Sequence, residues 1–165
     1  MIDLLEGIDV KTSYKYMVST IEDVCKTEKN IGATLSNITA ILNYYIKDIN
    51  WVGFYLVDKE NQNQLVLSYF QGNVACMRIN FGKGVCGSAI ANNEKYIVDN
   101  VHSFKGHIAC DSATNSEIVI PINVNGEKYG VLDVDSPIES RFTNDEDEAL
   151  CKVVKIIENY LSDKI

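Results

Sequence analysis

Apolar residues near the start of the chain recur at helical spacing. The first stripe lies within residues 14–28, and a second follows Gly32, where the pattern is interrupted. The two stripes comprise Tyr14, Met17, Val18, Ile21, Val24 and Cys25, then Leu35, Ile38, Leu42, Tyr45 and Ile46. A spacing of three and four residues places such side chains on one face, which predicts two amphipathic helices. Cys25 lies on the first stripe and is interpreted as a packing residue.

The period of the pattern changes at Trp51. Aromatic and β-branched residues fill positions 51–57 and turn residues follow, which predicts a strand with its hairpin partner at 65–70. Further short strands are expected at 76–80, 96–99, 117–124 and 128–135, and a glycine-rich loop at 81–87 leads to a short helix at 88–92. Asn125-Gly126 is a type I′ turn signal between the last two strands.

A final helix is expected after residue 143. Thr143 and Glu146 have the spacing of a capping box, and apolar residues recur at helical spacing up to Leu161. Cys151 flanks that apolar face and is interpreted as structural. Two helices, about six strands in runs and a last helix favour an α+β fold with an antiparallel sheet over alternating βαβ units. With 165 residues and no linker, residues 1–165 are expected to form a single domain.

Charge and composition exclude several classes of partner. The net charge is −8 and the pI is about 4.7, so binding to nucleic acid or to an anionic membrane surface is not expected. The sequence has no apolar run long enough for a membrane span and no secretory signal at Met1, so a cytoplasmic location is predicted. The cysteine count is five, and no Cys-x-x-Cys or His-x-x-x-His pair is present. A disulfide framework and a metal site are therefore both disfavoured.

Three cysteines lie in glycine-rich or polar stretches that are typical of loops: Cys76, Cys86 and Cys110. Their context indicates thiol chemistry rather than packing. Cys86 precedes the expected short helix, whose first amide groups would favour its thiolate; the same loop is alternatively a phosphate cradle. His102 and His107 are candidate bases or solvated loop residues.

Three carboxylates stand beside apolar strand sequence. Asp133 and Asp135 are two residues apart on one expected strand, so they share a face. Either they bind a cation or share a proton, or they cap the end of the strand. Glu117 begins another apolar strand. It is either a proton donor with a raised pKa or a solvated residue at the strand edge.

Two aromatic residues share a face of the strand at 51–57. Trp51 and Tyr55 are four residues apart, with Gly53 between them. This arrangement predicts either a slot that holds a methyl group or a cation, or an ordinary core stripe.

Five segments together resemble a known family. The chain is similar, from about Trp51 to Phe142, to the free methionine-(R)-sulfoxide reductases, which are built on a single GAF domain. The matching segments are Trp51-Val52-Gly53-Phe54-Tyr55, residues 81–87, residues 106–112, Ser116-Glu117-Ile118-Val119-Ile120-Pro121 and residues 130–136. The resemblance implies a six-stranded antiparallel sheet with the N- and C-terminal helices packed on one side.

The same resemblance implies a reaction and roles for the residues. Free L-methionine-(R)-sulfoxide would be reduced to methionine without a bound cofactor, and thioredoxin with its NADPH-dependent reductase would regenerate the enzyme. Cys110 would be the nucleophile, Cys76 the resolving thiol and Cys86 an auxiliary thiol. The carboxylates Glu117, Asp133 and Asp135 would hold the substrate and assist proton transfer, and a homodimer is plausible within the family.

The chemistry of sulfoxides is consistent with these roles. A thiolate attacks the sulfoxide sulfur, an acid protonates the oxygen, and the resulting sulfenic acid condenses with a second thiol. Two rival hypotheses stay open at this point. One is a GAF module that binds a small ligand without catalysis, and the other is a redox sensor whose cysteines form a disulfide.

Overall fold

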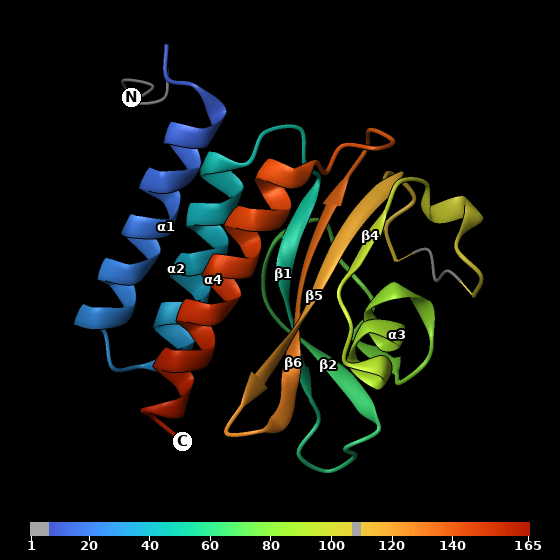
Figure 1. The fold of residues 1–165 in the computed structure, drawn as a ribbon. Coiled ribbons are helices and arrows are strands. Elements are labelled where there is room, and N and C mark those ends of the chain that lie inside the picture. Colours follow the sequence, from blue (N-terminus) through green and yellow to red (C-terminus); the bar gives the residue numbers. More distant parts are fainter. Residues whose placement is uncertain (1–6, 107–109) are drawn as a thin grey trace.

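The computed structural model describes residues 7–106 and 110–165 and shows a sheet covered by helices on both faces (Figure 1). Helices α2 and α4 lie over one face, with α1 packed against both of them, and the short helix α3 lies over the other face. In chain order the elements are α1 Val10–Thr27, α2 Ile31–Tyr45, β1 Trp51–Val57, β2 Gln64–Gly72, β3 Arg78–Asn80, α3 Gly84–Asn92, β4 Tyr96–Val98, a 3₁₀ turn at Val101–Ser103, β5 Ser116–Val124, β6 Glu127–Ser136 and α4 Asn144–Ser162.

The sheet has six antiparallel strands in the order β3-β2-β1-β6-β5-β4. The predicted α+β fold, with an antiparallel sheet and the terminal helices on one side, is therefore confirmed. Among the described residues, no helix is both long enough and apolar enough to cross a membrane.

The helix ends follow from local capping. The Asp9 side chain accepts a hydrogen bond from the Thr12 amide, so α1 begins at Val10, earlier than the apolar stripe suggests. Asn30 caps α2 in the same way, so Gly32 lies in its first turn instead of ending the pattern. A Cβ at Gly32 would lie 2.6 Å from the Tyr69 hydroxyl, so glycine permits the close approach of α2 to β2. The expected capping box at Thr143 is confirmed.

Alternation along β1 separates two apolar clusters. Val52 and Phe54 face α1, α2 and α4, where they join the larger cluster, while Trp51 and Tyr55 face α3. Most of the apolar burial therefore lies on the three-helix side, which anchors the sheet. The polar side chains of the site lie on the opposite face of the sheet, toward α3.

A bulge determines which side chains of β5 reach that face. Asn125 and Gly126 both have positive φ, as the predicted type I′ turn requires, and Val124 pairs with Glu127 beside the turn. The pairing then shifts between Ile122 and Asn123. Beyond the shift Glu117 pairs with Asp135, and Asp135 in turn pairs with Trp51 across β1. Directly paired residues project to the same face, so three strands present these side chains together toward α3.

Candidate active site

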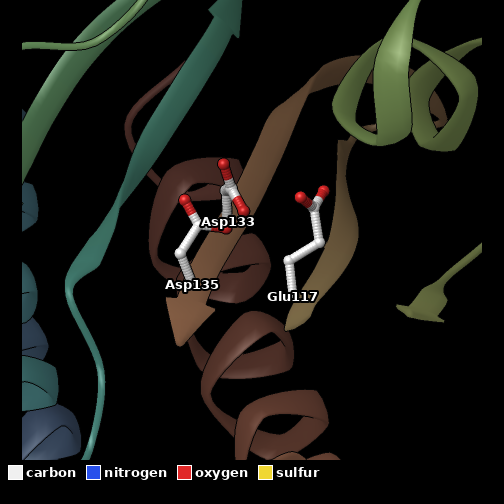
Figure 2. Close-up of side chains that lie close together, drawn as sticks. All are labelled: Glu117, Asp133 and Asp135. Atoms are coloured by element: carbon white, nitrogen blue, oxygen red, sulfur yellow. The ribbon is translucent and has the colours of Figure 1, made fainter. Parts of the chain in front are cut away.

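Three carboxyl groups converge on the α3 side of the sheet: Glu117, Asp133 and Asp135, called here the acidic trio. Figure 2 shows the two aspartates on β6 and Glu117 on the neighbouring strand β5. One carboxyl oxygen of each residue lies within 4.8 Å of the others. Oxygens this close accept an ammonium group or a metal ion readily, but they repel one another when all three are ionised.

Burial keeps protons on the acidic trio. Glu117 and Asp133 are each 7% exposed, and desolvation raises the pKa of Asp133 to about 7. Desolvation, followed by the charge of Asp133, raises the pKa of Glu117 and of Asp135 well above their ordinary values. Oδ1 of Asp133 and Oδ1 of Asp135 are both buried without a hydrogen-bond partner. The trio therefore offers at least one neutral acid and two free acceptor oxygens near neutral pH.

Cys86 contacts the acidic trio from helix α3. It lies in the first turn of α3, where its Sγ donates a hydrogen bond of 3.2 Å to Oδ2 of Asp133. The prediction that the helix N-terminus would favour its thiolate is wrong. Burial, and then the negative charges of Asp133 and Glu117, raise the pKa of Cys86 well above its ordinary value. Cys86 is also not a loop residue, because α3 begins two residues before it.

The two other cysteines are joined. Cys76 and Cys110 form a disulfide across 34 residues of sequence, with their Cα atoms 5.2 Å apart. Cys76 lies in the connection between β2 and β3, and Cys110 lies in the long segment between β4 and β5. Both residues are half-buried. Apart from this pair, Cys25, Cys86 and Cys151 are free thiols, and Cys25 and Cys151 pack against the three-helix cluster as expected.

A pocket connects the acidic trio to the disulfide. Its volume is about 40 Å³, and Cys110 lines it while Cys76 does not. The remaining lining comes from the α3 side of the sheet, from α3 and from the connecting segments: Trp51, Tyr55, Ala75, Ile79, Lys83, Gly84, Val85, Cys86, Asp111, Thr114, Glu117, Asp133 and Asp135. The structure thus gathers six of the predicted site residues in one lining besides Cys110, and it brings Cys76 to the edge of the pocket through the disulfide.

The aromatic pair forms a wall instead of a slot. Trp51 and Tyr55 are 2% exposed and stack with ring centroids 5.7 Å apart. A Cβ at Gly53 would lie 2.7 Å from the Trp51 ring and 2.4 Å from Cβ of Phe70. The space over Gly53 is therefore filled by the indole and by Phe70, because glycine allows the ring to lie flat on the strand. Both residues belong to the core, as one interpretation of this stripe expected, and they line the pocket as a wall and not as the slot of the other interpretation.

Several pocket residues were not singled out from the sequence. Lys83 precedes α3 and is an exposed, positively charged residue of the pocket lining. Asp111 and Thr114 lie on the opposite wall and both accept a hydrogen bond from Nδ2 of Asn50, at 3.0 and 3.1 Å. A lone lysine between two glycines was the available signal for Lys83. Nothing in the sequence around Thr114 sets it apart.

His102 is not among the described residues that line the pocket. The His102 ring nitrogen Nε2 lies 2.9 Å from Oδ1 of Asn115, at the surface. His107 lies outside the described residues. The ionisable groups in the described part of the lining are thiols and carboxyl groups, together with Tyr55 and Lys83.

Comparison of the sequence with known proteins identifies the family. Residues 32–154 match the GAF domain family, which defines the class of protein. A free methionine-R-sulfoxide reductase of Escherichia coli is 47% identical over 135 residues, covering 82% of this chain and 80% of the relative. A free methionine-R-sulfoxide reductase of Saccharomyces cerevisiae is 41% identical over 146 residues, covering 86% and 81%.

Solved structures give the same result. The X-ray structure of free methionine-R-sulfoxide reductase from Neisseria meningitidis, in complex with its substrate, is 39% identical with a TM-score of 0.90. The match covers 96% of this chain and 93% of that one. Among GAF-domain proteins, the chain belongs to the family of the free methionine-R-sulfoxide reductases.

Proposed function

We propose that this protein reduces free L-methionine-(R)-sulfoxide to L-methionine. One observation carries the proposal: in a member of this family, a disulfide cysteine lines a pocket whose other wall is a buried group of three carboxyl groups. Such a pocket combines a thiol that can accept an oxygen atom with acids that can deliver a proton.

Cys110 acts as the nucleophile in this proposal. In the reduced enzyme its thiolate attacks the sulfoxide sulfur, and Glu117, neutral because burial raises its pKa, protonates the departing oxygen. The S–O bond of the substrate breaks and the hydroxyl passes to Sγ of Cys110 as the transient bond between the two sulfurs breaks. Methionine therefore leaves with two more electrons, and Cys110 becomes a sulfenic acid. The Cys76 thiol then attacks Cys110 Sγ, water is released, and the disulfide seen in the structure forms. Cys86 is an auxiliary thiol, held neutral against Asp133.

The polar groups of the pocket suit a free amino acid. Asp133 and Asp135 accept the substrate ammonium through their unpartnered oxygens, and Trp51 and Tyr55 form an apolar wall for its methyl group. Lys83 is placed to pair with the carboxylate. A sulfoxide within a peptide lacks both terminal charges and would carry flanking chain into a pocket that has no room for it.

An external dithiol completes the cycle. Thioredoxin, kept reduced by its NADPH-dependent reductase, would open the disulfide by exchange, and no bound cofactor is required. A cytoplasmic location suits this electron source. We extend the proposal to the whole chain as one GAF domain and to a homodimer, on the strength of the family resemblance; sedimentation equilibrium measures the latter directly.

A coupled assay tests the reductase. Thioredoxin, thioredoxin reductase and NADPH are supplied with free methionine-(R)-sulfoxide, and NADPH oxidation and methionine are both measured. Wild type turns over repeatedly, Cys110→Ser forms no methionine even in a single turnover, and Cys76→Ser forms one methionine per enzyme and then stalls. Absence of methionine from the reduced wild type would refute the proposal and favour a ligand-binding or redox-sensing GAF domain.

A further inference from the structure

Two large apolar residues that are mostly exposed to solvent flank Cys76. Val74 is 89% exposed and Met77 is 75% exposed, and they are the most exposed large apolar residues in the part of the chain that the structure describes. Both belong to residues 73–77, called here the apolar loop, which connects β2 to β3. Exposed apolar side chains gathered beside a functional group commonly mark a binding surface for another protein.

The apolar loop is held in place by its backbone. The Trp51 Nε1–H donates to the Asn73 carbonyl at 3.2 Å, and the Tyr55 hydroxyl donates to the Cys76 carbonyl at 2.9 Å. The Met77 carbonyl accepts from the Leu67 amide at 2.9 Å. With three carbonyls fixed against the pocket wall and the neighbouring strand, the loop cannot fold its apolar side chains inward without breaking these bonds.

The two sulfurs of the disulfide differ in their surroundings. Cys110 lines the pocket, whose space of about 40 Å³ lies beside the acidic trio. A space of that size has no room for the active site of another protein. Cys76 is outside the pocket lining and lies between Val74 and Met77. Because these two residues are exposed, a partner protein can contact the chain beside Cys76.

We propose that the apolar loop is the docking surface for a thioredoxin-type dithiol protein, and that this partner attacks Sγ of Cys76. The inference rests on the proposed function, because it concerns the step that regenerates the enzyme. The partner thiolate forms a mixed disulfide with Cys76 while the Cys76–Cys110 bond breaks, and Cys110 leaves with the electron pair and takes up a proton. The second thiol of the partner then attacks its own bridged sulfur and releases Cys76 as a thiol. Two electrons pass to this protein, and the partner is left with a disulfide.

Substitution of the exposed side chains tests the surface. Val74→Ser and Met77→Ser, singly and together, are compared with Val10→Ser, whose side chain is 51% exposed on α1 across the sheet. The double variant should raise the KM for thioredoxin about tenfold or more, the loss expected when apolar contacts at the centre of an interface are removed. Its rate with dithiothreitol and its single-turnover yield of methionine should match wild type, and Val10→Ser should match wild type throughout.

A trapping experiment tests the attacked sulfur. Oxidised wild-type protein is mixed with thioredoxin whose second active-site cysteine is serine, and the mixed disulfide is located by peptide mapping. Bridging at Cys76 supports the inference, and bridging at Cys110 overturns it. An unchanged KM for thioredoxin in the double variant, or an equal loss with dithiothreitol, overturns the docking surface. Failure of the reductase itself is distinguishable, because the reduced wild type would then form no methionine.

Discussion

Replacing Asp133 by asparagine should stabilise the folded protein at pH 8. The carboxyl is 7% exposed, and desolvation raises its pKa from 3.8 to about 7. The folded state therefore holds a proton that the unfolded chain has already lost. At about 1.4 kcal/mol per pKa unit, full ionisation costs the wild type at most about 4 kcal/mol. Asparagine avoids this cost, keeps the shape of the side chain and still accepts the Cys86 hydrogen bond.

The effect of Asp133 on the free energy of unfolding should change with pH in one direction only. A carboxyl whose folded pKa is raised contributes stability at low pH, and that contribution is lost as pH rises through about 7. The gain in the variant should thus be largest at pH 8 and should shrink toward zero as pH falls to about 4. The charge of Asp133 also raises the pKa of Glu117 and of Asp135, so its removal adds to the effect in the same direction.

Urea unfolding of the oxidised proteins at several pH values measures this difference. Asp58→Asn is a control of opposite sign, because its hydrogen bond with Arg78 lowers the pKa of Asp58. That variant should lose stability at neutral pH and recover in acid. A gain for Asp133→Asn that is independent of pH, or a loss that grows with pH, would show that the site does not hold its proton as argued.

Three further predictions concern the same region. Glu117→Gln should lower kcat and kcat/KM together by about 10²- to 10⁴-fold in the coupled assay, and an unchanged kcat would exclude Glu117 as the proton donor. Cys86→Ala should still yield one methionine per enzyme. Because its hydrogen bond lowers the pKa of Asp133, the midpoint of the pH–stability curve should move upward, which the same urea series detects. Gly130→Ala should destabilise the fold by about 3 kcal/mol or more, since the new Cβ would lie 2.3 Å from the Tyr55 carbonyl oxygen; wild-type stability would contradict this close approach.

Local patterns in the sequence predicted most elements of the fold. The run of aromatic and β-branched residues predicted β1 at its observed bounds, and Asn125-Gly126 predicted the turn between β5 and β6. Both signals act within a few residues. The start of α3 was missed, since Gly84 has positive φ and Lys83 provides no side-chain cap. That helix is stabilised by residues such as Ile90 that pack against the sheet. Local sequence does not reveal this packing.

The site residues were predictable one by one, but their arrangement was not. Counting back from the turn without the bulge would place Glu117 opposite Val134, on the face of the three helices. The one-residue shift between Ile122 and Asn123 reverses this and brings Glu117 to Asp135. The position of Trp51 over Gly53 depends equally on contacts between strands.

The size of the pocket has a consequence for the order of events. About 40 Å³ is well below the roughly 150 Å³ that accommodates benzene in an enclosed cavity, so we expect the disulfide form to bind an amino acid poorly. Under the proposed function, we expect methionine sulfoxide to enter only after the bond between Cys76 and Cys110 opens, and methionine to leave before it closes. The two substrates, sulfoxide and dithiol protein, then never occupy the enzyme together. Double-reciprocal plots at several fixed dithiol concentrations should be parallel, and free methionine should not slow reduction of the disulfide.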